Sequence, residues 1–313
     1  MAWLEITIDT TAPGTGPVAA ALTAGGFSDL VIEDQGEFES FLEDNRDYWD
    51  YIDEEFQQQL QGLSRVKLYL QEDQAEERSR LEKLVQSLGL TMKVDTLPDV
   101  DYEESWKDSY PPQVVGQRLI VLPYWLADSD AQGREKVILD PGLTFGTGAH
   151  PSTRMVMEAM EELVHPNASC LDLGSGSGIL SIAALRLGAG RAVGVDIDPK
   201  AEDIARENAA YNGFAAPEFT ALTGNVTADR SLMERLAADA YDVVLVNIVA
   251  DVIIGLAPTL PCFLTAQSRL ICSGILDSRL EDVLSALKKA GLRVLEVRQM
   301  EEWRCVIAER SSL

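Results

Sequence analysis

The sequence predicts an α/β protein with two domains. The larger domain is expected to contain a doubly wound, mostly parallel sheet, and the smaller to be an α+β domain. The chain has 313 residues, enough for two domains of ordinary size. From Cys170 onward, short apolar runs alternate with segments of helical periodicity, a pattern typical of a parallel sheet covered by helices. We expect a first domain over residues 1–97, a linker with a short helix over 98–116 and a second domain over 117–313.

In the first domain, β-patterned runs and glycine-bounded helical segments predict a short series of elements. Strands are expected at residues 3–8, 29–33, 65–70 and 90–94, and helices at 18–23 and 74–88. This order, β-α-β-β-α-β, is that of ferredoxin-like domains. Between the second and third strands lies an acidic insertion, around residues 34–60, with interleaved aromatic side chains. It either docks a basic partner or packs on the small domain as an amphipathic helix.

The second domain is expected to begin with two strands and a helix, followed by regular alternation. The first strands are expected at 119–122 and 137–139, and the helix at 151–164. Later strands are expected at 170–173, 192–195, 243–246, 269–272, 292–299 and 304–309, with helices at 179–187, 199–212 and 279–290. The last two strands have no helix between them, which predicts an antiparallel hairpin at the sheet edge. Ligands of such sheets bind at the carboxyl ends of the strands.

Composition narrows the class of protein. Hydrophobic residues make up 46% of the chain, yet no apolar run is long enough to span a membrane, and the amino terminus does not resemble a signal peptide. We therefore expect a cytoplasmic protein that does not contact membranes. The four cysteines form no C-x-x-C pair, so we expect neither a metal site nor disulfides. A formal net charge of −25 opposes nucleic-acid binding; it either suits a basic protein partner or only keeps the chain soluble.

The run Leu171–Gly178, followed by Val193–Asp196, predicts a pocket for an adenosine. Glycines at alternate positions of the first run allow positive φ angles and a close approach of a ligand to the backbone. Ile179 follows the last glycine, which excludes both a Walker loop and a dinucleotide fingerprint. The acid that ends the second strand, Asp196, can accept hydrogen bonds from both ribose hydroxyls. The G-x-G-x-G spacing resembles motif I of class I S-adenosylmethionine-dependent methyltransferases, whose fold is Rossmann-like.

For three further polar residues near these motifs we favour structural roles. Asp198 precedes Pro199 and is expected to cap the following helix. Asp172 either anchors the glycine turn or contacts the ligand through water, and we favour the anchor. His150 precedes Pro151, and we favour a helix cap over a catalytic base.

Two further segments extend the candidate site. Residues 139–153 are rich in glycine and hydroxyl groups and lead directly into a helix, as expected for a lid or ligand-shaping loop. Asn247–Ala250 follows an apolar strand at the place where class I enzymes that methylate nitrogen hold their acceptor. The Asn247 amide is either a strand-end cap or the group that orients an amine.

Together these segments closely resemble the PrmA family, methyltransferases that modify a protein of the large ribosomal subunit, number eleven, on lysine side chains and its N-terminal amine. The resemblance covers nearly the whole chain, from the Trp106 region to Trp303, and is weaker in the first domain. It implies S-adenosylmethionine as cofactor and a first domain that grips the ribosomal protein. The residues it assigns to the donor are Thr153, Gly174, Asp196 and Asn247, with Phe145, Gly146, Thr147 and Gly176 nearby. The acceptor motif usually has leucine where this chain has Val249, which should alter packing rather than chemistry.

The resulting hypothesis is a protein-lysine N-methyltransferase in which Asn247 is the catalytic residue and orients the amine. Free lysine has a pKa of about 10.4 and must lose its proton before transfer, and solvent can accept that proton. The alternatives are methylation of another protein, methylation of a nucleobase, or binding without chemistry. Nucleobase enzymes normally place an aromatic residue at the fourth motif position, where this chain has Ala250. We expect a monomer whose partner is the ribosomal protein, with no direct contact to nucleic acid.

Overall fold

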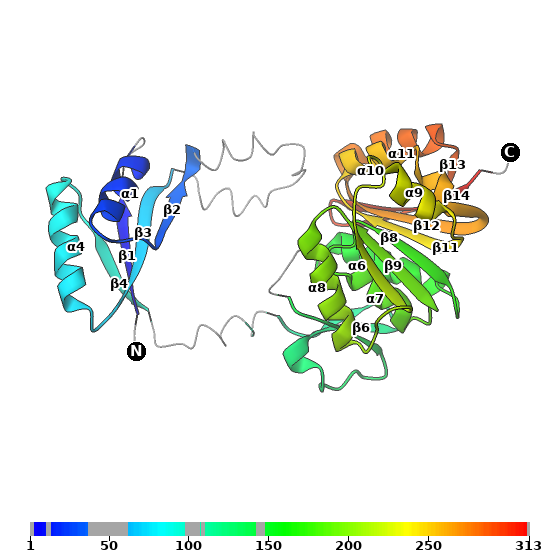
Figure 1. Ribbon diagram of the computed structural model, residues 1–313, viewed down its shortest axis with the longest axis horizontal. Helices are drawn as coiled ribbons and strands as arrows, with labels where there is room; N and C mark the ends of the chain where they lie inside the picture. Colours follow the sequence, from blue (N-terminus) through cyan, green and yellow to red (C-terminus); the bar gives the residue numbers. More distant parts are fainter. Residues whose placement is uncertain are drawn as a thin grey trace. The chain divides into compact units, whose positions relative to one another are not determined.

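The computed structural model describes residues 3–10, 14–36, 62–97, 107, 110–141 and 148–311 (Figure 1). Contacts divide the chain into two compact units, Met1–Ser109 and Tyr110–Leu313. Among the predicted site residues, Phe145, Gly146 and Thr147 lie outside the described residues, as do Trp106 and most of the acidic insertion. In the described part of the chain, no helix is long and apolar enough to cross a membrane.

The first unit is an antiparallel sheet with the strand order β2-β3-β1-β4, covered by helices α1 and α4. Its elements are β1 (Trp3–Asp9), α1 (Thr15–Ala24), β2 (Leu30–Asp34), β3 (Ser64–Gln71), α4 (Ala75–Ser87) and β4 (Lys93–Leu97). Alternate side chains of a strand share a face, so Ile6 and Ile8 of β1 both point into the core, where Leu22 of α1 and Leu81 of α4 meet them. The element order is the ferredoxin-like order that the sequence predicts.

The second unit contains, within the described residues, a seven-stranded sheet with the order β10-β9-β8-β11-β12-β14-β13. The strands are β8 (Ser169–Leu173), β9 (Arg191–Asp196), β10 (Phe219–Thr223), β11 (Tyr241–Asn247), β12 (Leu264–Leu276), β13 (Leu292–Met300) and β14 (Trp303–Arg310). Strands β8 to β12 run parallel, whereas β14 pairs antiparallel with both β12 and β13. The doubly wound sheet and its terminal antiparallel hairpin are therefore confirmed.

Helices cover both faces of this sheet (Figure 1). They are α6 (Pro151–Leu163), α7 (Ile179–Arg186) and α8 (Pro199–Tyr211) on one face, and α9 (Arg230–Ala237), α10 (Ala250–Leu256) and α11 (Leu280–Lys289) on the other. Strand β11 illustrates the result: Val243 and Leu245 pack into the first layer, and Val244 and Val246 into the second. Burial on both faces explains why this strand is a continuous apolar run rather than an alternating one.

A smaller three-stranded sheet, β5-β6-β7, packs on the face that carries α6 and α7. It consists of β5 (Gln113–Val115), β6 (Leu119–Pro123) and β7 (Glu135–Leu139), with β5 antiparallel and β7 parallel to β6. Strand β5 falls inside residues 98–116, which the sequence assigns to a linker, so the end of that segment is part of this sheet. Elements β5, β10, α9 and α10 are not predicted from the sequence, and neither are the short 3-10 helices, Tyr124–Leu126, Leu260–Phe263 and Asp277–Arg279.

Candidate functional site

Those of the predicted site residues that the structure describes meet where three adjacent parallel strands end. Strand β8 lies between β9 and β11, and it leads into Gly174, while its neighbours end at Asp196 and Asn247. Neighbouring parallel strands present their carboxyl ends at one edge of a sheet, so three segments distant in sequence converge there. The start of α6 reaches the same place, because Thr153 contacts Asn247.

The turn after β8 has the backbone geometry that its glycines predict. Gly174, Gly176 and Gly178 have φ angles of 79°, 48° and 78°, a region that residues with a Cβ rarely adopt. The turn is closed by hydrogen bonds from the Gly174 N–H to the Val195 carbonyl at 2.8 Å and from the Gly178 N–H to the Ser175 carbonyl at 2.8 Å. Helix α7 begins directly after Gly178, so its first N–H groups face the end of the turn.

Two of these glycines are also required by close packing. A Cβ on Gly174 would lie 2.4 Å from Cγ2 of Ile248, the residue that follows Asn247. A Cβ on Gly178 would lie 3.0 Å from the Cβ of Ala205 in α8. The turn therefore touches the acceptor motif on one side and α8 on the other.

Asp196 holds the turn through its side chain. Its Oδ2 accepts a hydrogen bond from the Gly176 N–H at 2.8 Å, and its Oδ1 accepts one from the Asp198 N–H at 3.0 Å. Each carboxylate oxygen has a second acceptor site, so both remain able to bind hydroxyl groups, as a ribose requires. Asp198 itself caps α8 by accepting from the Lys200 N–H at 2.9 Å, with Pro199 as the first helical residue, and this confirms the predicted cap.

Asp172 lies beneath the turn, with a relative exposure of 1%. Its Oδ2 accepts hydrogen bonds from the Ser181 N–H at 3.2 Å and the Ser181 hydroxyl at 2.9 Å, and this ties β8 to α7. Its Oδ1 has no partner among the described residues. Burial raises the pKa of Asp172 to about 7. The contacts are those of the turn anchor that we favoured from the sequence.

Asn247 and Thr153 form the contact that joins the acceptor motif to α6. The Asn247 Nδ2 donates to the Thr153 Oγ1 at 3.1 Å across a sequence separation of 94 positions. Thr153 is buried, and Asn247 is half-buried at the end of its strand. The amide carbonyl of Asn247 can still accept from an N–H group.

Ile248 is confined on two sides. The side chain of Ile248 lies against Gly174, and its backbone lies against Gly274, which has a φ of 82°. A Cβ built on Gly274 would lie 2.5 Å from the Ile248 carbonyl oxygen. The Ile248 N–H donates to the Ser273 carbonyl at 3.2 Å. Gly274 is thus a residue of the site that sequence reasoning missed; its only signal is a glycine within an apolar strand.

His150 caps α6, as favoured from the sequence. Its Nδ1 accepts from the Ser152 N–H at 3.3 Å and lies 2.7 Å from the Ser152 hydroxyl. The ring packs edge-on against Trp303, with 4.5 Å between ring centroids. Desolvation lowers the pKa of His150, so the ring is uncharged at neutral pH.

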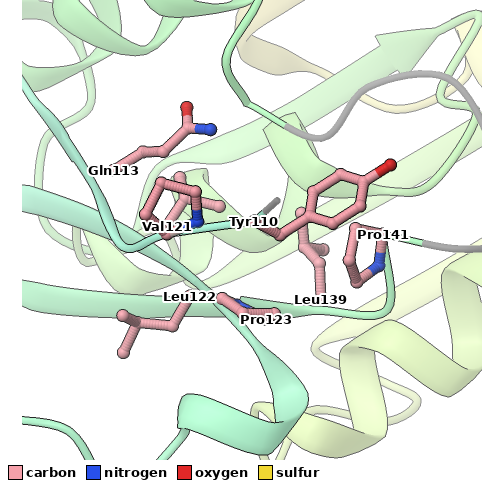
Figure 2. Close-up of a pocket in the computed structure, with 8 residues that line it drawn as sticks. Tyr110, Gln113, Val121, Leu122, Pro123, Leu139 and Pro141 are labelled. Carbon is pink, nitrogen blue, oxygen red and sulfur yellow. The ribbon is translucent and has the colours of Figure 1, made fainter. Parts of the chain in front are cut away.

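The described residues on either side of 142–147 lie close to β6, β7 and α7. Pro141 and Tyr110 line one small pocket, with Val121, Pro123 and Leu139 from the carboxyl ends of β6 and β7 (Figure 2). On the other side, a Cβ on Gly148 would lie 3.1 Å from side-chain carbons of Val121 and Ile179. Pro141 and Gly148 therefore both lie against the three-stranded sheet, and Gly148 also lies against the first residue of α7, the helix that follows the glycine turn.

Two buried asparagines at the carboxyl end of α8, Asn208 and the capping residue Asn212, are further residues that sequence reasoning did not assign to the site. Asn208 donates from Nδ2 to the Ser177 carbonyl at 2.9 Å and accepts at Oδ1 from the Asp140 N–H at 2.9 Å. Asn212 bonds the backbone of Ile138. The available signal was a pair of amides at i and i+4 on one helix face.

The arrangement fits an S-adenosyl ligand. The glycine turn offers a surface that a single Cβ would obstruct, Asp196 retains acceptors for a ribose, and a buried carboxyl oxygen of Asp172 lies beneath. Thr153 and Asn247 add hydroxyl and amide groups at the adjacent strand end.

Comparisons with known proteins agree with this geometry. The family described as ribosomal protein L11 methyltransferase (PrmA) matches residues 2–311. A ribosomal protein L11 methyltransferase of Heliobacterium modesticaldum is 35% identical, covering 100% of this chain and 99% of the relative, and one of Alkaliphilus oremlandii is 33% identical, covering 99% of each. A solved structure of ribosomal protein L11 methylase from Lactobacillus delbrueckii subsp. bulgaricus has 29% identity and a TM-score of 0.58, covering 65% of this chain and 100% of that chain. The chain is an S-adenosylmethionine-dependent methyltransferase, and it belongs to the ribosomal protein L11 methyltransferase (PrmA) family.

Proposed function

We propose that this enzyme methylates lysine side chains and the N-terminal amine of ribosomal protein L11, with Asn247 as the residue that orients the amine. Family membership and the names of the relatives support the protein substrate. The net charge of −25 supports it independently, because a basic ribosomal protein is attracted to an acidic enzyme. Such a substrate implies activity in the cytoplasm. One chain supplies the donor-side and acceptor-side groups, which favours action as a monomer.

The hydrogen bond between Asn247 and Thr153 carries the assignment of the site. It fixes the Asn247 amide at the end of β11, beside the turn that begins at Gly174. With Nδ2 engaged, Oδ1 is the group left to accept an N–H of an uncharged amine and to aim its lone pair. Thr153 acts through Asn247 in this respect and is a positioning residue.

The donor side consists of the glycine turn, Asp196 and Thr153. The turn and Asp196 would hold the adenosyl part of S-adenosylmethionine, and Thr153 would contact the donor as the family resemblance implies. When bound, S-adenosylmethionine supplies an electrophilic methyl group on a sulfonium sulfur. Phe145, Gly146 and Thr147 belong to this proposal through the family resemblance alone.

Proton removal needs no dedicated base in this proposal. His150 uses Nδ1 to cap α6, and its lowered pKa leaves it a poor proton acceptor at neutral pH. Solvent therefore takes the lysine proton before transfer, and Asn247 acts by orientation. This predicts activity that rises with pH as more of the lysine becomes uncharged.

A nucleobase substrate is disfavoured at the acceptor motif. Ala250, the fourth residue of the motif, is completely buried at the start of α10 and has no ring to stack on a base. The acidic charge of the chain opposes a polyanion as well.

Substitution of Asn247 and Thr153 tests the assigned roles. Asn247→Ala should lower turnover far more than donor affinity, because it removes the group that orients the amine. Thr153→Val, which keeps the shape but removes the hydroxyl, should lower both turnover and donor affinity, because Thr153 holds Asn247 and also belongs to the donor side. The matched control Thr153→Ser should retain most of both. Donor affinity is measured by isothermal titration and turnover by a steady-state methylation assay. An equal loss of donor binding and rate in Asn247→Ala would refute the acceptor role.

Transfer of radiolabelled methyl groups tests the substrate. Purified L11, other ribosomal proteins and ribosomal RNA are each incubated with the enzyme and labelled S-adenosylmethionine. We expect label in L11, and mass spectrometry should locate it on lysine side chains and the N-terminal amine. Label in RNA or in a different protein would refute the proposal, and so would tight donor binding without any transfer.

A further inference from the structure

Strand β7 forms one edge of the three-stranded sheet, and two side chains at the carboxyl end of α8, Asn208 and the capping residue Asn212, occupy the place of its missing neighbour. Asn212 accepts from the Ile138 N–H at 2.9 Å and donates to the Ile138 carbonyl at 2.7 Å, the pair of bonds that an adjacent strand would make. Two residues after Ile138, the Asp140 N–H donates to the Asn208 Oδ1 at 2.9 Å. Residues i and i+4 of a helix are about 6 Å apart and alternate residues of a strand about 7 Å, so the two spacings match.

The two asparagines differ in what their remaining groups contact. The Asn208 Nδ2 donates at 2.9 Å to the carbonyl of Ser177, which lies between Gly176 and Gly178 in the glycine turn. The second bond of the Asn212 Nδ2 goes instead to the Asn208 carbonyl at 2.8 Å, within α8. Asn208 has no exposed surface, and Asn212 is 5% exposed. Asn208 is thus the member of the pair that links β7 to the turn.

We propose that Asn208 is a positioning residue for methyl-donor binding, which sets the conformation of the glycine turn by fixing the Ser177 carbonyl against the end of β7. Three residues of the turn, Gly174, Gly176 and Gly178, lack a side chain, which leaves the turn many alternative conformations in isolation. A buried amide that is bonded at both ends selects one of them. This inference rests on the donor chemistry and is independent of L11 as the substrate.

Isosteric substitutions of the two asparagines test the proposal. Asn208→Asp keeps the acceptor for Asp140 but places a second acceptor against the Ser177 carbonyl, and the dissociation constant of S-adenosylmethionine should rise about tenfold or more. Asn212→Asp places an acceptor against the Ile138 carbonyl one helical turn away, beside Arg186, whose Nη2 lies 3.4 Å from the Asn212 Oδ1. It should lower the midpoint of urea unfolding, yet change the dissociation constant less than about twofold.

The comparison separates positioning from stability. Equal increases of the dissociation constant in both variants would mean that the pair only supports the fold, and no increase in Asn208→Asp would refute the role of Asn208. Hydrogen exchange of the unmodified enzyme gives a second measurement that does not depend on the variants folding. Saturating S-adenosylhomocysteine should protect the amide of Asp140, which Asn208 bonds, more than that of Ile138, which Asn212 bonds. Equal protection, or none, would also overturn the proposal.

Discussion

A methyl group added at Gly174 should damage both donor binding and stability. The φ angle of Gly174 is 79°, and the new Cβ would lie 2.4 Å from Cγ2 of Ile248. Ile248 cannot move away easily, because its backbone packs closely against Gly274 on the other side. A Cβ built on Gly274 would lie 2.5 Å from the Ile248 carbonyl oxygen. Relief of the clash in Gly174→Ala must therefore displace the turn, the acceptor motif or both.

The size of the effect follows from two contributions. An alanine in the left-handed region costs about 1–2 kcal/mol. Overpacking of a well-packed site costs about 1–3 kcal/mol more. The total, about 2–5 kcal/mol, is a large part of the roughly 5–15 kcal/mol that stabilises a typical domain. Because Ile248 follows Asn247 directly, turnover should fall together with donor affinity.

A matched control separates the two contributions. Gly213 has a φ of 75° and nothing within 4 Å of a built Cβ, so Gly213→Ala carries the backbone strain alone. Urea unfolding and isothermal titration of S-adenosylmethionine are measured for both variants. Ile248→Ala, added to Gly174→Ala, should restore part of the donor affinity by removing the clashing branch. The reasoning is refuted if Gly174→Ala unfolds at the same urea concentration as Gly213→Ala and binds the donor like the unmodified enzyme.

Three further predictions concern the cap, the buried acid and the protein substrate. Asp198→Ala removes the cap of α8 and should lower the free energy of unfolding by about 1 kcal/mol in urea titrations, with Asp198→Asn close to the unmodified enzyme. The folded-state pKa of Asp172, about 7, is above its ordinary value of 3.8, so this group makes stability fall as pH rises from about 4 to 7. Asp172→Asn should flatten that decline in urea titrations at pH 4.5 and 7.5, and parallel curves would contradict the assignment. Added salt should raise the KM for L11 more than the KM for the donor, since screening weakens attraction to a chain of net charge −25, and equal changes would argue against electrostatic recruitment.

Features that depend on short stretches of sequence were predicted well. The caps by Asp198 and His150 require only the residues that follow them, and the positive φ angles of Gly174 and Gly178 follow from the absence of a side chain. The convergence of Gly174, Asp196 and Asn247 was also predictable, because parallel strands end at one edge once their order is known.

Features that depend on three-dimensional packing were not predictable in the same way. Strand β10, Phe219–Thr223, is a short edge strand with little apolar periodicity, and its pairing with β9 supplies what its own pattern lacks. Strand β5 is similar, since Gln113–Val115 is too short to be distinguished from a linker. The bonds of Asn208 to Ser177 and Asp140 span 31 and 68 positions, and the identity of an asparagine does not indicate such partners.

The contacts of Ile248 couple the glycine turn to the Asn247–Ala250 motif. Strand β11 lies between β8 and β12; Gly174 directly follows β8, and Gly274 lies within β12. Gly174 leaves room for the Ile248 side chain, and Gly274 leaves room for the Ile248 carbonyl. The Ile248 N–H is held by Ser273, and the preceding Asn247 by Thr153. A shift of the glycine turn therefore reaches Asn247 through a single residue. Variation at Val249 is better tolerated on this account, because the constraints fall on the two residues before it.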